Sequence, residues 1–239
     1  MNTAFDPHTL VSLPVQGKAE LLFLLCHGVG GQAAHMAPFA AALRAQYPQA
    51  AIVSLNGPDA FEGAGGYQWF SVADLSEINR IERIDAALPA FITRIRAWGR
   101  HFELDWPMVA LAGFSQGGIM ALEAVQAEPQ LAGRVLAFSG RHVDAPTHAP
   151  ADTTVHLFHG IDDTVIPYRA SVDSAQCLMA LGGDVTADVL PGLGHALHTE
   201  LMDKAIGQLR TFLPKKVWRQ AMSEAPVIPR AASSEELGG

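Results

Sequence analysis

The sequence predicts an α/β fold with a mostly parallel central sheet, and three features of the chain support this. Short apolar runs alternate with longer segments whose apolar positions recur at helical spacing. Those runs are apolar at consecutive positions, which is typical of strands that helices cover on both faces. Loops rich in glycine or polar residues follow most of the runs. We therefore expect one sheet of about seven strands with helices on both faces.

The composition is that of a globular α/β domain. The chain has 239 residues, of which 49% are hydrophobic and 17% are charged, so it can fill a large core. Its formal net charge is -8, and no dense cluster of lysine and arginine occurs. Because nucleic acids and anionic membranes attract basic surfaces, neither is an expected partner.

The sequence also favours a cytoplasmic location. The only two cysteines are Cys26 and Cys177, and Cys26 lies inside an apolar run, which fits a reducing compartment. Residues 1–18 lack the basic start and apolar stretch of a signal peptide. The longest continuous apolar segment, Leu21–Cys26, is too short to span a bilayer, so stable membrane insertion is not expected.

Three strands and one helix are expected near the start of the chain. A weak strand over 8–16 has mixed alternation and should lie at a sheet edge. Leu21–Cys26 and Ala50–Leu55 are apolar throughout and should be buried strands. Between them, residues 33–46 have helical character and end before Pro48.

A long loop and a long helix should follow. Residues 59–76 show neither helical nor strand periodicity, and an irregular loop of this length in a compact domain is usually functional. Residues 78–98 carry apolar side chains at helical spacing and predict an amphipathic helix. Pro89 lies inside this helix and should bend or interrupt it.

In the second half of the chain, apolar runs continue to alternate with segments of helical spacing. A polar, proline-containing loop is expected at 141–153. We expect one domain over 1–216 and a C-terminal tail over 217–239 that is partly disordered or packed on the surface. The expected strands are 108–112, 134–140, Thr154–Gly160 and 185–190, and the expected helices follow Ser115 and cover 170–181 and 197–212.

One short motif suggests that the sheet carries a nucleophilic serine. Gly113-Phe114-Ser115-Gln116-Gly117 joins an apolar strand to a helix and fits the Gly-x-Ser-x-Gly nucleophile elbow of α/β hydrolases. In that elbow a strained turn exposes the serine at the top of the sheet. The alternative is an ordinary strand-to-helix turn with a capping serine. The two interpretations differ in whether the rest of the chain supplies the acid and the base that a nucleophilic serine needs.

A serine nucleophile needs a base and an orienting carboxylate, which follow it in the order acid, then histidine, in this fold. The candidate acids after Ser115 that lie beyond strands are Asp144, Asp162 and Asp163. They leave the choice of acid open. Ligands bind beyond the carboxyl ends of strands in such sheets, so the loops that carry these groups should gather at one edge.

The best candidate base is His195, which lies in a glycine-flanked loop between the last strand and the last helix. His198 is its rival, but it should lie on a helix face. His142 and His148 precede the paired aspartates and break the expected order. His195 and His198 have no third ligand at a recognised spacing, so neither a metal nor any other cofactor is expected.

Two backbone amides are candidates for the oxyanion hole. One is the N–H of Gln116, directly after the serine, and the other is that of Val29, in the glycine-rich loop His27-Gly28-Val29-Gly30-Gly31. The alternative role for this loop is to cradle a phosphate. It lacks the lysine and the serine or threonine of a P-loop, which argues against that alternative.

With these loops in place, the chain resembles the phospholipase/carboxylesterase family of α/β hydrolases, which includes acyl-protein thioesterases and small bacterial carboxylesterases. Within it, the chain is most similar to a bacterial esterase subgroup that shares His-Gly-Val-Gly, Gln-Trp-Phe-Ser-Val and Gly-Gly-Asp-Val-Thr. The matching motifs are His27-Gly28-Val29-Gly30, Gln68-Trp69-Phe70, Gly113 to Gly118, His159-Gly160-x-x-Asp163 with Val165-Ile166-Pro167, and Gly194-His195.

The resemblance implies Ser115, Asp163 and His195 as a catalytic triad. It selects Asp163 over Asp162 because the family acid stands four residues after the histidine of His-Gly. One position departs from the pattern. Many members carry an acidic residue directly after His-Gly-x-Gly, whereas this chain has Gly31.

The predicted function is that of a serine carboxylesterase acting on short- to medium-chain carboxylic esters through an acyl-enzyme. Alternatives are an acyl-protein thioesterase or lysophospholipase acting on longer chains, or a non-catalytic binding protein on the same fold. A dienelactone hydrolase is disfavoured because it would need cysteine at the elbow, where this chain has Ser115. A peptidase is disfavoured because it would need an extra domain to bind an extended chain. The partner is a small-molecule ester or thioester. A homodimer through Trp218 and the last helix is a further hypothesis. Met36, Phe61, Trp69 and Phe70 are candidates to line the acyl site.

Overall fold

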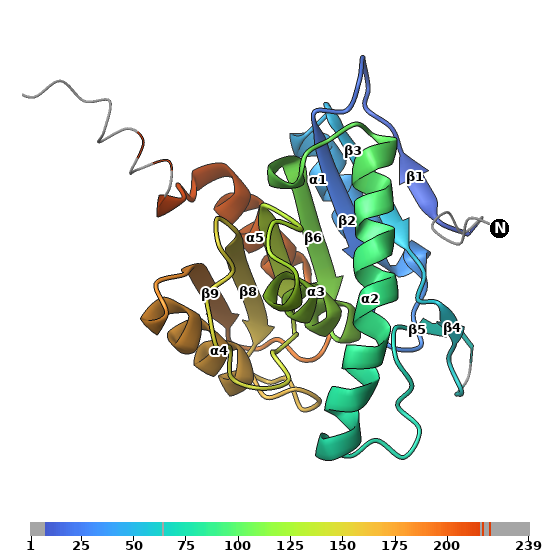
Figure 1. Ribbon diagram of the computed structural model, residues 1–239, viewed down its shortest axis with the longest axis vertical. Helices are drawn as coiled ribbons and strands as arrows, with labels where there is room; N and C mark the ends of the chain where they lie inside the picture. Colours follow the sequence, from blue (N-terminus) through green and yellow to red (C-terminus); the bar gives the residue numbers. More distant parts are fainter. Residues whose placement is uncertain (1–7, 64, 216, 218–219, 221–239) are drawn as a thin grey trace, which may run out of the picture.

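The computed structural model describes residues 8–63, 65–215, 217 and 220 (Figure 1). Within these residues a seven-stranded sheet has the strand order β1-β3-β2-β6-β7-β8-β9. The edge strand β1 is antiparallel to β3, and all other neighbours are parallel. The predicted fold is therefore confirmed. The strands are β1 (Leu10–Ser12), β2 (Leu21–Cys26), β3 (Ala50–Leu55), β6 (Val109–Phe114), β7 (Arg134–Phe138), β8 (Thr154–Gly160) and β9 (Asp184–Leu190).

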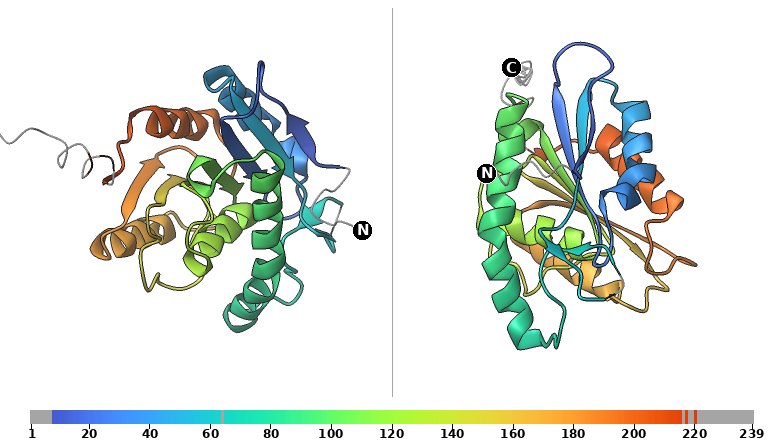
Figure 2. Two further views of the ribbon diagram at one scale, coloured as in Figure 1. Left: turned by 45° about the horizontal axis from the view of Figure 1, so that its top comes forward. Right: turned by 90° about the vertical axis from the view of Figure 1, so that its right-hand side faces the viewer.

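Helices cover both faces of the sheet, as Figure 2 shows in its right-hand view. The helices α2, α3 and α4 pack on one face, and α1 and α5 pack on the other. Each face has its own buried apolar cluster, which explains why the central strands are apolar at consecutive positions. The helices are α1 (Ala37–Gln46), α2 (Glu77–His101), α3 (Gln116–Ala127), α4 (Arg169–Ala180) and α5 (Thr199–Thr211), with short 3₁₀ turns at Ala33–Met36 and Trp106–Met108.

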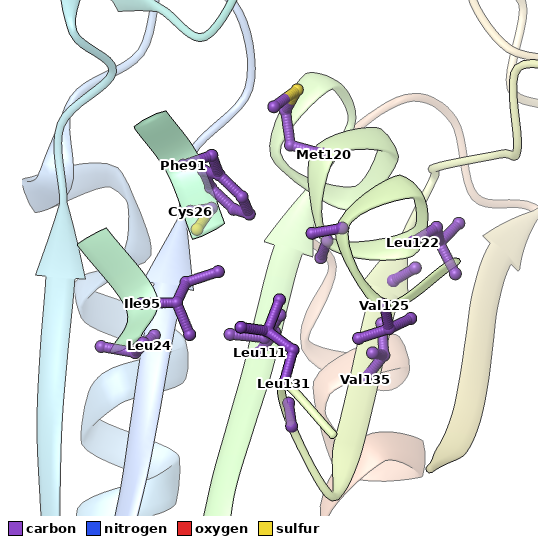
Figure 3. Packing of buried hydrophobic residues seen from close by; sticks show 14 of the residues in the cluster. Leu24, Cys26, Phe91, Ile95, Leu111, Met120, Leu122, Val125, Leu131 and Val135 are labelled. Carbon is purple, nitrogen blue, oxygen red and sulfur yellow. The ribbon is translucent and has the colours of Figure 1, made fainter. Parts of the chain in front are cut away.

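Helix α3 lies over the middle of the sheet, where most of its side chains are buried (Figure 3). Met120 and Leu122 on α3 are fully buried, as is Leu111 on β6 beneath them. Phe91 and Ile95 of α2 complete this cluster. Each fully buried side chain of this size stabilises the fold by roughly 1.5–3 kcal/mol. The turn between β6 and α3 is therefore held between two firmly packed elements.

Of the two outcomes expected at Pro89, a bend or an interruption of the helix, the structure excludes the interruption. Helix α2 runs unbroken from Glu77 to His101, with Pro89 inside it. Pro89 and Asp85, the residue one turn earlier, are both exposed. Water can therefore solvate the Asp85 carbonyl that proline leaves without a donor. Ser76 begins the helix with a capping box, in which its side chain accepts the Asn79 N–H.

Two other predicted segments differ in detail. The helix expected over 33–46 is split into the 3₁₀ turn Ala33–Met36 and α1, with a proline in the first turn of α1. The loop expected over 59–76 contains a two-stranded antiparallel ribbon of β4 (Asp59–Ala60) and β5 (Tyr67–Gln68). Strands of two residues are too short to show periodicity in a sequence.

The predicted C-terminal tail, 217–239, lies outside the described residues except for positions 217 and 220, and so does Trp218. Among the helices that the structure describes, none combines the length and apolar character needed to cross a bilayer.

Candidate active site

Ser115 lies in a strained turn at the carboxyl end of β6. Its backbone has φ 51° and ψ -116°, a conformation that costs a non-glycine residue about 1–3 kcal/mol. The Ser115 N–H donates to the Phe138 carbonyl of β7 (2.8 Å), which holds the turn against the next strand. The residue after Ser115 begins α3, so the serine projects from the sheet edge at the start of a helix.

Close backbone packing explains the glycines around this serine. A Cβ added at Gly117 would lie 2.3 Å from the Cys26 carbonyl oxygen of β2. A Cβ at Gly113 would lie 2.2 Å from the Gly117 carbonyl carbon. No side chain fits at these distances, so glycine is required at both positions. The spacing Gly-x-Ser-x-Gly thus follows from the contact between β2, β6 and α3.

A chain of hydrogen bonds joins Ser115 to His195 and Asp163. The His195 Nε2 lies 2.9 Å from the Ser115 Oγ, and its Nδ1 lies 2.7 Å from the Asp163 Oδ2. Since the carboxylate accepts at Nδ1, the proton of the neutral imidazole resides there and Nε2 can accept the serine proton. The Phe114 ring packs against the His195 ring, with centroids 5.0 Å apart.

The Asp163 carboxylate is surrounded by donors. Its Oδ1 accepts the backbone N–H groups of Val165 and Ile166, both at 2.9 Å. Its side chain is fully buried, and burial raises the pKa of Asp163. The hydrogen bonds from His195 and from these two amides outweigh burial and lower the pKa below its ordinary value. The carboxylate is therefore held ionised and in one rotamer.

A second histidine reaches the same carboxylate. The Nε2 of His159 lies 3.1 Å from the Asp163 Oδ2 and 2.8 Å from the Ile166 carbonyl oxygen, so Nε2 carries a proton. Its Nδ1 lies 2.7 Å from the Ser171 Oγ. Burial lowers the pKa of His159, which keeps the ring neutral. From the sequence, His159 is recognised only as a residue of the His-Gly motif. Its position in His-Gly, four residues before Asp163, could have indicated this contact.

The glycine-rich loop after β2 lies beside the serine. A Cβ at Gly28 would lie 3.3 Å from the Ser115 Cβ and 3.0 Å from the Phe114 ring. A Cβ at Gly31 would lie 2.8 Å from the Gly28 carbonyl oxygen, which leaves no room there for the acidic residue of many family members. Val29, between them, is 39% exposed and faces the same cavity as Ser115.

The Gln116 side chain ties the elbow to the loop before α2, a contact that sequence reasoning missed. Its Oε1 accepts the Trp69 N–H at 2.8 Å, and its Nε2 donates to the Phe70 carbonyl at 2.7 Å. The amide group thereby pairs with two neighbouring backbone groups of that loop. As the first residue of α3, Gln116 also has a backbone N–H with no intrahelical acceptor.

His27 forms hydrogen bonds with the loops that follow β2 and β3, next to the contacts of Gln116. Its Nε2 accepts the Gly57 N–H at 3.0 Å, so Nδ1 carries the proton and donates to the Gly28 carbonyl at 2.6 Å. The Trp69 indole N–H donates to the His27 carbonyl at 2.8 Å. Burial lowers the pKa of His27 to about 4, which matches a neutral ring with both nitrogens paired.

A cavity of about 500 Å³ opens at Ser115, with Val29, Phe70 and Gln116 also in its wall. A larger cavity of about 880 Å³ lies beside α2 and is lined by Trp69 but by none of Ser115, Asp163 and His195. We assign the candidate active site to the smaller cavity because Ser115 lies in its wall and is hydrogen-bonded to His195, which is in turn bonded to Asp163.

In the part of the chain that the structure describes, the other candidate acids and bases are not part of the hydrogen-bonded chain that joins Ser115, His195 and Asp163. Asp144 and Asp162 are exposed, and no hydrogen bond from His195 to either is seen among the described residues. His198 precedes α5, with its Nε2 at 3.2 Å from the Gly194 carbonyl oxygen. His142 is buried and His148 exposed, and neither contacts the serine in the described structure.

The four candidates for the acyl site are not brought together. Phe70 lines the Ser115 cavity, whereas Trp69 lines the larger one. Met36 is 1% exposed and packs with Phe39 in the core on the opposite face of the sheet. Phe61 lies against Gly30, where a Cβ would be 3.1 Å from its ring. Of the four, only Phe70 is placed to contact a substrate at Ser115.

The family model for phospholipase/carboxylesterase proteins matches residues 10–213. The chain belongs to this family. The predicted family is therefore confirmed. A phospholipase/carboxylesterase relative, esterase YpfH of Escherichia coli strain K12, is 40% identical over 216 residues, covering 90% of this chain and 93% of that protein.

Two further comparisons agree with membership of the phospholipase/carboxylesterase family. The crystal structure of esterase PE8 superposes with a TM-score of 0.78 at 27% identity, covering 85% of this chain and 98% of that one. Acyl-protein thioesterase 1 of Gibberella zeae is 35% identical over 116 residues, which covers 45% of this chain and 49% of that protein. The protein is a serine hydrolase of the carboxylic ester hydrolase class, and the likeness to a thioesterase is partial.

Glu123 on α3 anchors the loop after β7 near this site. Its carboxylate accepts the Val143 N–H at 2.7 Å. Burial raises the pKa of Glu123 to about 7, with Asp85 and Asp144 adding to the increase and the Val143 N–H opposing it. In the unfolded chain the carboxyl group releases this proton near the ordinary glutamate pKa of 4.5. Ionisation therefore destabilises the fold as the pH rises from about 4.5 to 7, and the cost is constant above that range.

We expect Glu123→Gln to stabilise the protein at pH 8, because the amide oxygen keeps the bond to Val143 without the buried charge. The gain should be about 1–2 kcal/mol in unfolding free energy, less than the full linkage value because the side chain is half-buried. Urea unfolding of both proteins at pH 8 and pH 5 measures it. The difference should shrink markedly at pH 5. An equal difference at both values would show that ionisation is not its cause.

Proposed function

We propose that the protein is a serine carboxylesterase that hydrolyses short- to medium-chain esters with Ser115, His195 and Asp163 as its catalytic triad. The observation that carries the proposal is the hydrogen-bonded chain from Ser115 through His195 to a buried carboxylate, at the mouth of a cavity. A hydroxyl alone is a poor nucleophile, and this arrangement supplies the base and the group that orients it.

The proposed reaction proceeds through an acyl-enzyme. The Ser115 Oγ attacks the ester carbonyl carbon as His195 Nε2 takes its proton, and the tetrahedral oxyanion accepts the backbone N–H groups of Val29 and Gln116. Collapse of this intermediate breaks the acyl–oxygen bond, and His195 returns its proton to the leaving alcohol. Water then attacks the acyl carbon with His195 as base again. One water is consumed, and a carboxylic acid and an alcohol are released without a cofactor.

Cavity size supports the preference for shorter chains. About 500 Å³ is in the lower half of the range that small-molecule sites occupy. Thioesterase or lysophospholipase activity on longer acyl chains is the second candidate, favoured by the likeness of half the chain to an acyl-protein thioesterase. A cytoplasmic location is also proposed, supported by the two free cysteines, Cys26 and Cys177. A homodimer stays a prediction.

Graded substrates test the proposal. We expect p-nitrophenyl esters with short and medium acyl chains to be hydrolysed with a higher kcat/KM than long-chain esters and long-chain acyl thioesters. A fluorophosphonate probe should label the protein at Ser115 and abolish the activity. Higher activity on long-chain thioesters would favour the second candidate. Absence of both labelling and hydrolysis would leave a non-catalytic binding protein and contradict the proposal.

A further inference from the structure

His159 and His195 meet at one oxygen of the Asp163 carboxylate. The Asp163 Oδ2 lies 2.7 Å from the His195 Nδ1 and 3.1 Å from the His159 Nε2. The other oxygen, Oδ1, accepts two backbone N–H groups. The side chains of His159 and Asp163 are both fully buried, so their contact lies away from bulk water. The oxygen that serves the proposed base therefore has a second imidazole as a neighbour.

The surroundings of His159 determine which of its nitrogens donates. Its Nε2 lies 2.8 Å from the Ile166 carbonyl oxygen as well as close to Asp163, so this nitrogen faces two acceptors and must carry a proton. Its Nδ1 lies 2.7 Å from the Ser171 Oγ, which has the Gly140 carbonyl oxygen as a second neighbour at 3.0 Å. The hydroxyl has a single proton, which goes to the unprotonated Nδ1 at the shorter distance. His159 is thus a neutral ring whose Nε2–H is shared between Asp163 and Ile166.

Neither substrate binding nor the rotamer of Asp163 requires this contact. His159 is not among the described residues that line the Ser115 cavity. The two amides on Oδ1 already hold the carboxylate in place. What the Nε2–H changes is the negative charge that Oδ2 presents to His195, because a hydrogen bond to an ionised oxygen stabilises its charge. A second donor on that oxygen therefore weakens its interaction with a protonated His195.

From this arrangement we propose that His159 is a positioning residue whose Nε2–H shares the Asp163 Oδ2 with His195 and limits how strongly the carboxylate stabilises the protonated base. The inference rests on the proposed function, since it requires His195 to be the base that takes the Ser115 proton. Among the described residues, Asp163 and His195 are the titratable groups that act on His159. His159 itself gains and loses no proton in the reaction.

His159→Phe tests the inference because it keeps a ring of similar shape and removes the N–H. The acidic limb of the kcat/KM profile reports protonation of the base in the free enzyme. Without the second donor, Oδ2 stabilises the protonated His195 more strongly, so the base is lost at a higher pH. We expect the midpoint of this limb to rise by about 0.5–1 pH unit, the shift that one hydrogen bond supplies.

Below the limb the variant should be about 3- to 10-fold slower than the parent, and the two rates should converge towards neutral pH. Initial rates on p-nitrophenyl butyrate measure the profile, read at the isosbestic wavelength of p-nitrophenol so that the signal does not change with pH. His159→Gln, whose carboxamide supplies an N–H, should return the midpoint towards that of the parent.

Ser171→Ala is the matched control for packing around the ring. It removes the partner of the His159 Nδ1 but leaves Nε2 facing its two acceptors, so the proton should stay on Nε2. Thermal unfolding should show a loss of stability in this variant, whereas the midpoint of the acidic limb should not move. The parent offers a test without any substitution, because the ¹⁵N chemical shifts of His159 should report a proton on Nε2 and none on Nδ1.

The outcomes separate this inference from the proposed function. A midpoint in His159→Phe that equals or lies below that of the parent would overturn the inference and leave the esterase assignment standing, and so would an equal rise in Ser171→Ala. A proton on the His159 Nδ1 in the parent would also overturn it, even if His159→Phe did not fold. Failure of the parent to hydrolyse any ester would overturn both.

Discussion

Replacing Ser115 by alanine is expected to reduce kcat/KM for ester hydrolysis by at least about 10⁴-fold. The substitution removes the proposed nucleophile, the Ser115 Oγ, which lies 2.9 Å from His195 Nε2. Alanine keeps the Cβ that serine already carries at φ 51°, so the elbow should keep its shape. Initial rates on p-nitrophenyl butyrate measure the loss, and a fluorophosphonate probe should no longer label the protein.

The chain contains a matched control for this variant. Ser139 stands at the end of the neighbouring strand β7 with φ 46°, and its N–H donates to the Phe158 carbonyl, just as Ser115 donates to Phe138. Its Oγ has no hydrogen-bond partner among the described residues. Ser139→Ala should therefore keep activity within a few-fold of the parent. Substantial hydrolysis by Ser115→Ala would contradict the proposed mechanism, and an equal loss in both variants would indicate a packing effect.

The order of strands and helices could be predicted from the sequence because its central strands are covered on both faces. Such strands are apolar at every position, as in Leu21–Cys26, and glycine or proline marks where many of the segments end. The sequence could not decide whether Pro89 interrupts its helix, because the cost of a proline depends on whether water reaches the carbonyl one turn earlier. That depends on tertiary burial, which a local rule does not contain.

Some features of the candidate site could likewise be predicted from the sequence, and others could not. Ser115 and His195 could be proposed because each follows a strand of one parallel sheet, and topology brings these loops to one edge. The same reasoning left several aspartates as candidate acids, and only the family resemblance selected Asp163. The contacts of the Gln116 side chain with Trp69 and Phe70 could not be predicted, because they join positions 46 and 47 residues apart through loop packing.

Asp163→Asn is expected to lower kcat by about 10³–10⁴-fold while leaving the fold intact, and the geometry explains why so small a change has so large an effect. The Oδ1 accepts two backbone N–H groups, from Val165 and Ile166, so the amide oxygen of asparagine must take that place. The amide nitrogen then occupies the Oδ2 position, 2.7 Å from the His195 Nδ1. Two donors cannot face each other, so His195 must accept at Nδ1 and carry its proton on Nε2. In that tautomer it cannot take the Ser115 proton.

Two measurements distinguish this explanation from a loss of structure. The ¹⁵N chemical shifts of His195 should report protonation at Nδ1 in the parent and at Nε2 in Asp163→Asn. Asp162→Asn is the matched control, because Asp162 is the exposed neighbour and its side chain is not seen to contact either histidine in the described structure. It should retain parental kcat. An unchanged tautomer in Asp163→Asn, or a kcat within ten-fold of the parent, would show that Asp163 does not orient the base.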